Sequence, residues 1–141
     1  MPLAINLRPN ERLIVNGVVI QNSAAGAKLL IHNNAAVLRE KDIISEQNAN
    51  TPARRIYFAI QCRYLFPGKD ETYLPLVHQF IEEFAAAAPS TSALVDEIRR
   101  HVDEGQFYQA LKSAKQLIAR EQEILNGFPR ASLSDADANP R

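Results

Sequence analysis

The chain has 141 residues, no net charge and one cysteine, Cys62. This length suits one domain, or two small halves that share a core. The single thiol excludes an intrachain disulfide and a thiolate cluster for metal, and no apolar run reaches the roughly 20 residues of a membrane span. Because the N-terminus also lacks a basic and apolar leader, we expect a cytoplasmic protein with no membrane contact.

The first part of the chain shows the two-residue periodicity of β-strands. Asn16-Gly17 separates two short apolar runs, as in a type I′ hairpin. Short strands are predicted over 3–8, 13–15, 18–20, 28–32 and 36–39. We therefore expect a small antiparallel β-sheet, curled or barrel-like, within a β-rich basic region of residues 1–44.

From about residue 45 the periodicity becomes helical. Thr51 and Pro52 form a helix start, and Pro67-Gly68 ends the helix that follows. Further apolar stripes predict helices over 72–88, 94–102 and 107–125. Pro75 is placed in the first turn of its helix, where proline is tolerated.

These patterns predict an α+β fold in which a C-terminal bundle of about four helices follows the sheet. The helical region, residues 45–126, is expected to pack on the β-rich region. Residues 127–141 are small and polar and include two prolines, and we expect them to form a disordered tail.

The charge is divided unevenly along the chain. Residues 1–69 hold nine Lys and Arg and four Asp and Glu, a net charge of +5, and the remainder carries −5. A basic half favours a polyanion such as nucleic acid, because binding releases counterions. The alternative is that the two halves attract each other, within one chain or across a dimer.

No motif for catalysis is found. His32, His78 and His101 lie far apart, and none has an acidic or thiol partner at motif spacing. Cys62 lies among apolar residues of a predicted helix, where an inert thiol is usual. The residues thus predict a binding protein with no catalytic residue, no metal site and no cofactor.

Two longer stretches carry a family resemblance. They read LLIHNNAAVLREKDI at 29–43 and ANTPARRIYFAIQ at 49–61. Together with Met1-Pro2-Leu3 and the Asn16-Gly17 turn, they resemble the FlbT family of flagellum-biosynthesis repressors of alphaproteobacteria, over residues 1–126.

The resemblance implies post-transcriptional control of flagellin. Members of the family act at the 5′ untranslated region of flagellin mRNA and limit its translation or stability. Some members activate instead, often together with the companion regulator FlaF. The family has no established catalytic site, so the resemblance implies a repressor that binds the flagellin mRNA leader.

If RNA is bound directly, the basic half supplies the candidate contacts. Arg and Lys would hold phosphates, whereas Asn side chains would reach base edges or the 2′-hydroxyl. The candidates are Arg8, Arg12, Lys28, His32, Asn33, Asn34, Arg39, Lys41, Arg54 and Arg55.

Each group of candidates also has a structural interpretation. Asn33-Asn34 could only form a turn, and Arg39 and Lys41 could pair with neighbouring acids. Arg54 and Arg55 could only solvate the edge of a helix. Two arginines in a first turn oppose the helix dipole, a cost that an anion or a carboxylate from another segment would offset.

The alternative function is a protein-interaction regulator, or a chaperone-like adaptor of flagellar assembly, that acts through FlaF or flagellin. It is favoured by the absence of an evident exposed aromatic residue among the basic candidates. Its candidate contacts are Tyr57, Phe58, Phe107 and Tyr108, although core packing is common for such residues. A homodimer is also expected to be possible, because short strands leave open sheet edges.

Overall fold

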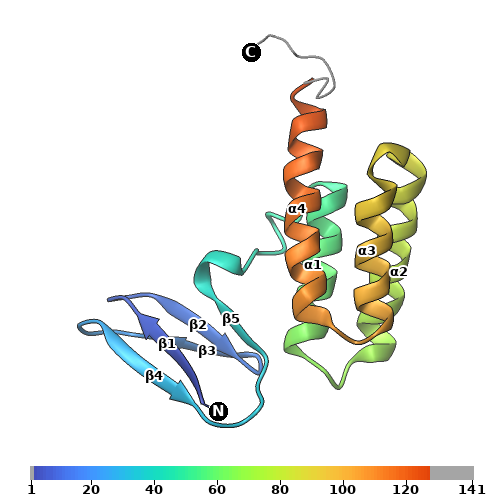
Figure 1. Cartoon of the computed structure of the whole chain (residues 1–141). Coiled ribbons are helices and arrows are strands. Elements are labelled where there is room, and N and C mark those ends of the chain that lie inside the picture. Colours follow the sequence, from blue (N-terminus) through green and yellow to red (C-terminus); the bar gives the residue numbers. More distant parts are fainter. Residues whose placement is uncertain (1, 128–141) are drawn as a thin grey trace.

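The computed structural model describes residues 2–127, in which five strands form two small antiparallel sheets beside a group of helices (Figure 1). The first sheet pairs β1 with β4, and the second has the order β3-β2-β5. The strands are β1 Leu3–Leu7, β2 Arg12–Val15, β3 Val18–Gln21, β4 Ala27–Ile31 and β5 Val37–Arg39.

The tight turn between β2 and β3 has the expected geometry. Asn16 and Gly17 have φ angles of 52° and 85°, which are the positive values of a type I′ turn. The Asn16 side chain also accepts a hydrogen bond from the Ala36 N–H at 2.8 Å, so the hairpin is attached to the segment before β5.

The two sheets pack against each other through a small apolar core. Ile5 and Leu7 of β1 contact Leu13 of β2 and Val37 of β5, and all four side chains are buried. The α+β class is thus confirmed. Within residues 2–127, however, the strands are divided between two open sheets rather than forming one curled sheet or barrel, because no ladder joins β1 to the second sheet.

Four α-helices follow, with a short 3-10 turn before the first helix and another before the third. The helices are α1 Pro52–Leu65, α2 Asp70–Ala87, α3 Ser92–Asp103 and α4 Phe107–Leu125, and the 3-10 turns are η1 Glu40–Asp42 and η2 Pro89–Thr91. Thr51 caps α1 as predicted, because its side chain accepts from the Arg54 N–H. Pro75 lies deeper in α2 than predicted, since that helix begins at Asp70.

Helix α1 is the central element of the helical core. It packs against α2 and α4, and half of its residues, among them Ile56 and Ile60, are buried. Strand β5 joins this core to the sheets, because consecutive strand residues point to opposite faces. Val37 therefore contacts the core between the sheets, whereas Leu38 is buried among the helices.

The segment after η1 docks on α1. The buried Gln61 amide donates to the Ile44 carbonyl at 2.9 Å and accepts from the Ile44 N–H at 3.0 Å. The predicted boundary between regions 1–44 and 45–126 therefore falls on a segment that is hydrogen-bonded to β2 through Glu40 and to α1 through Ile44. The division into these two regions stays a prediction. Residues 128–141 of the predicted tail lie outside the described residues.

Candidate nucleic-acid interface

Three hollows follow one another along the junction between the sheets and the helices. The first lies between β1, β4 and β5 and has a volume of about 550 Å³. The second, of about 540 Å³, shares Arg39 with the first, and the third, of about 490 Å³, shares Leu38, Lys41, Asp42 and Tyr108 with the second. The shared residues place the three hollows next to one another, in order from the β1–β4 sheet to α4.

Basic side chains line each of these hollows. Six Lys and Arg residues and one acid, Asp42, contribute to the three hollows. We call the six basic residues the basic track: Arg8, Lys28, Arg39, Lys41, Lys112 and Lys115.

The sheet end of the basic track is organised around Arg39. Its guanidinium donates to the Asn6 carbonyl at 2.7 Å and to the Glu11 carboxylate at 3.2 Å. The strand register places Lys28 opposite Asn6, and Arg8 follows β1 directly. The hydrogen bond from the Arg8 backbone N–H, and then the Arg39 side chain, lower the pKa of Glu11. Glu11 thus stays ionised and holds Arg39 in place.

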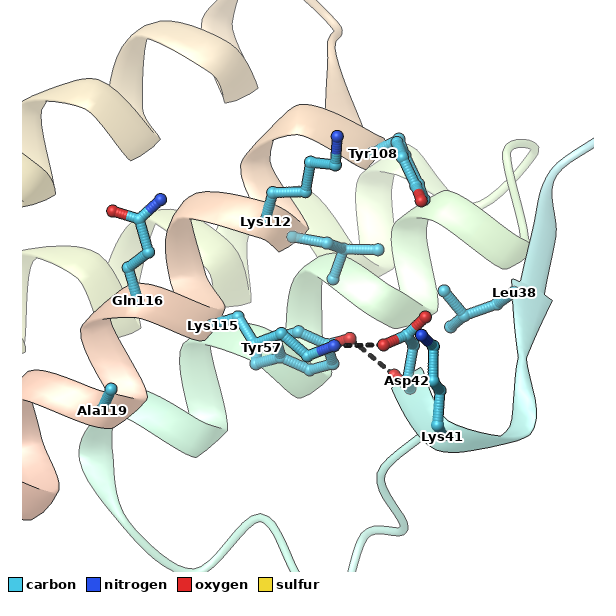
Figure 2. A pocket seen from close by; sticks show the side chains of 10 residues that line it. Leu38, Lys41, Asp42, Tyr57, Tyr108, Lys112, Lys115, Gln116 and Ala119 are labelled. Carbon is cyan, nitrogen blue, oxygen red and sulfur yellow. Dashed lines mark hydrogen bonds and ion pairs between the residues drawn. The ribbon is translucent and has the colours of Figure 1, made fainter.

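The helix end of the basic track lies over α1 and α4 (Figure 2). The Tyr57 hydroxyl donates to the Asp42 carbonyl at 2.5 Å, and Lys115 pairs with the Asp42 carboxylate. Burial, and then the charge of Asp42, raise the pKa of the Tyr57 hydroxyl far above its ordinary value. Asp42 therefore fixes one lysine of the track and leaves the others available.

Four members of the basic track have no acidic partner. Among the described residues, Arg8, Lys28, Lys41 and Lys112 form no salt bridge, and all four are exposed. Lys112 instead lies over the Tyr108 ring, with its Nζ atom 5.4 Å from the ring centroid. Cations that no acid of residues 2–127 neutralises are available to bind an external anion.

The basic track brings together four of the ten residues predicted to bind RNA, namely Arg8, Lys28, Arg39 and Lys41. Arg12 lies outside it and contacts Glu40, both through a 3.9 Å salt bridge and through its backbone N–H. His32, Asn33 and Asn34 are exposed in the connection between β4 and β5.

Arg54 and Arg55, in the first turn of α1, line none of the three hollows, although Arg54 is about one helical turn before Tyr57, which lines the third. Arg54 donates to Asn50, and the buried Glu121 carboxylate accepts from the Ala53 N–H at 2.8 Å. The carboxylate from another segment that would offset the helix dipole is therefore present.

Sequence reasoning missed Lys112 and Lys115 of α4, and it gave Tyr108 only as a candidate protein contact. Tyr108, Lys112 and Lys115 are spaced i, i+4 and i+7, which places them on one face of a helix. This spacing was readable in the sequence, but the negative charge of the C-terminal half obscured it. Of the aromatic candidates, Tyr57 and Phe107 are buried and Phe58 is half-buried, whereas Tyr108 is 43% exposed.

The junction contains no recognisable catalytic group. Cys62 is half-buried, and burial, followed by the charge of Glu46, raises the pKa of its thiol. Within residues 2–127, no three His, Cys, Asp or Glu side chains are grouped so that they could hold a metal ion. None of the helices of this part of the chain has both the length and the apolar character needed to cross a membrane.

Comparison with known proteins identifies the family. Residues 3–125 match the family described as Flagellar protein FlbT. The chain belongs to the FlbT family. This FlbT-family chain is 39% identical to a probable flagellum biosynthesis repressor protein FlbT of Rhodopseudomonas palustris, over 89% of the chain and 99% of the relative.

Other FlbT proteins match over almost the whole chain. The probable repressor FlbT 1 of Bradyrhizobium diazoefficiens is 38% identical, over 99% of the chain and 94% of the relative. The flagellum biosynthesis repressor protein FlbT of Caulobacter vibrioides is 34% identical, over 98% of the chain and 99% of the relative. No solved structure matches the chain.

Proposed function

We propose that this FlbT-family chain represses flagellin synthesis by binding the 5′ untranslated region of flagellin mRNA, and that the basic track is the binding surface. The basic track is the single observation that carries the proposal. In this proposal the protein acts in the cytoplasm. It occupies the leader, which limits the translation or the stability of the mRNA, and it catalyses no reaction.

The charge of the basic track supports RNA as the ligand. Six basic side chains line three neighbouring hollows. Arg39 is paired with Glu11 and Lys115 with Asp42, and the other four form no salt bridge with residues 2–127. Each phosphate that a Lys or Arg neutralises releases counterions from the nucleic acid, so a row of unpaired cations favours binding. Flagellin mRNA is proposed as the target because relatives are named flagellum biosynthesis repressors.

A salt titration of RNA binding tests this proposal. We expect the purified protein to shift a labelled flagellin leader at low salt, with an affinity that falls steeply as salt rises. The double variant Lys28→Glu/Lys112→Glu changes one exposed lysine at each end of the basic track, and neither forms a salt bridge within residues 2–127. It should lower the slope of log K against log salt by about 1.4, because each phosphate contact to a single strand contributes about 0.7.

The matched control is Arg100→Glu/Arg120→Glu. It makes the same change in net charge at exposed helix positions outside the three hollows, where the salt bridges of Arg100 and Arg120 with residues 2–127 are long, at 3.9 and 3.8 Å. The control should bind like wild type. Equal losses of RNA affinity in the two double variants would show that the total charge of the protein, and not the basic track, determines affinity. Absence of a shift by the wild-type protein at low salt would refute direct RNA binding.

A second candidate function is an adaptor that binds FlaF or flagellin through β3. This strand is the edge of its sheet, and Val18 and Val19 are each 60% exposed, on opposite faces. An exposed apolar edge strand is a template for an added strand. Val19→Lys should abolish capture of FlaF or flagellin if this candidate holds, whereas Leu30→Lys, on the other sheet, should not. Light scattering of the same variants would show whether β3 also pairs with a second copy.

A further inference from the structure

Tyr108 is an exposed aromatic residue that borders two of the three hollows. It is the second residue of α4, and the preceding Phe107 is buried in the helical core, which fixes the start of the helix. The Tyr108 ring lies 5.9 Å from the Tyr64 ring at an angle of 41°. The two rings are therefore in contact at a tilt and are not stacked parallel.

The surroundings of Tyr108 combine an apolar wall with a cationic rim. Leu38 and Leu111 line the third hollow together with Tyr108, whereas Lys41 and Lys112 supply the charge. Figure 2 shows that Tyr108 and Lys112 both come from the first part of α4, and that Lys115 is held by Asp42. A ligand that fits both features has a flat aromatic face and negative charge next to it.

We infer that Tyr108 is the stacking platform for one unpaired nucleobase, whose flanking phosphates bind Lys41 and Lys112. This inference rests on the proposed RNA binding and specifies which part of the RNA is bound, an unpaired nucleobase with its flanking phosphates. Hollows of about 490 and 540 Å³ are within the size range of small-molecule sites. Every base has a π-face, so stacking here selects single-stranded RNA over duplex without selecting a sequence.

The inference separates the roles of neighbouring side chains. A lysine that binds phosphate contributes to the salt dependence of affinity, whereas a stacked ring contributes affinity that salt does not change. Tyr108 and Lys112 are four residues apart on one helix face, so the two effects can be compared at one place on the surface.

The experiment measures binding of the full chain to a single-stranded oligonucleotide of the flagellin leader and to the same sequence as a duplex. Tyr108→Ala should weaken single-strand binding by about tenfold and leave both the salt slope and duplex binding unchanged. Tyr108→Phe and Tyr108→Trp should bind like wild type. Lys112→Ala should instead lower the salt slope by about 0.7. Circular dichroism and thermal unfolding check that each variant is folded.

Each result distinguishes this inference from the proposed function. If the wild-type protein binds the leader and Tyr108→Ala binds it equally well, the stacking inference is overturned and RNA binding by the basic track stands. If the wild-type protein does not bind RNA at low salt, both proposals fail. If Tyr108→Ala loses capture of a FlaF or flagellin partner while RNA affinity is unchanged, the hollow is a protein site and the inference is wrong.

Discussion

The Glu121 carboxylate of α4 accepts a hydrogen bond from the backbone N–H of Ala53, at the start of α1, at 2.8 Å. It completes the capping of that helix. Pro52 has no N–H, the Arg54 N–H donates to the Thr51 hydroxyl, and the Arg55 N–H donates to the Thr51 carbonyl. A buried negative charge at this end of α1 also compensates the helix dipole, which Arg54 and Arg55 oppose.

Loss of this carboxylate should therefore destabilise the protein. Glu121→Ala leaves the buried Ala53 N–H without an acceptor and should lower the free energy of unfolding by about 2 kcal/mol. Glu121→Gln keeps an acceptor oxygen and should cost less. Urea unfolding followed by circular dichroism measures both, with the exposed Gln109→Ala of the same helix as control. Equal stability of Glu121→Ala and wild type would contradict this account of the cap.

The Tyr64 hydroxyl connects α1 to β5, and its removal should loosen this connection. The hydroxyl donates to the Val37 carbonyl and accepts from the Val37 N–H, both at 3.1 Å. Tyr64→Phe removes both bonds and should cost about 1–2 kcal/mol of stability. Hydrogen exchange should show faster exchange at the Val37 amide. Tyr73→Phe is the control, since the Tyr73 hydroxyl makes no hydrogen bond with the described residues, and it should leave that amide unchanged.

A side chain at Gly17 should destabilise the Asn16-Gly17 turn. The φ angle of Gly17 is 85°, and a Cβ atom there would lie 2.8 Å from Cε1 of Phe66. The exposed Phe66 ring can move, but the backbone strain stays, so Gly17→Ala should cost about 1–2 kcal/mol. Gly26→Ala is the matched control, because its added Cβ would make only an ordinary 3.6 Å contact. A thermal shift that is the same for both variants would contradict the strain argument.

Local features of the sequence predicted most of the elements. The alternation around Ile5, the Asn16-Gly17 turn and the Thr51 cap each depend on residues close in the chain, and the structure confirms all three. The start of α2 was misplaced because Lys69 provides no side-chain cap that would mark it. Whether strands form one sheet or two depends on pairing between distant segments, which periodicity does not report.

The candidate site was only partly predictable for the same reason. Charge counting selected Arg8, Lys28, Arg39 and Lys41, which line the three hollows, but it also selected Arg54 and Arg55, which do not. Their surroundings depend on Glu121, 68 residues away from Ala53. Lys112 and Lys115 join the basic track only because α4 packs beside η1, a tertiary contact that no local pattern shows.

Two tyrosine hydroxyls, that of the buried Tyr57 and that of the half-buried Tyr64, should make the protein sensitive to alkaline pH. Burial is the main cause that raises the pKa of both Tyr57 and Tyr64 above the ordinary value of 10.0. The folded state therefore keeps these protons at a pH where the unfolded chain has lost them. Their contribution to stability is complete below about pH 10 and falls as pH rises further, by up to about 1.4 kcal/mol per pH unit for each group.

Urea unfolding at about pH 8 and about pH 11 measures this effect. Tyr57→Phe loses the hydrogen bond to the Asp42 carbonyl and should be less stable than wild type at the lower pH. Because Tyr57→Phe has one titrating hydroxyl fewer, its free energy of unfolding should fall less steeply with pH than that of wild type. The difference in free energy of unfolding between the two proteins should therefore be smaller at the higher pH. Tyr73→Phe is the control for removing a tyrosine hydroxyl that makes no hydrogen bond with the described residues, and it should be as stable as wild type at the lower pH. Parallel curves for Tyr57→Phe and wild type would show that Tyr57 ionises equally in the folded and unfolded states.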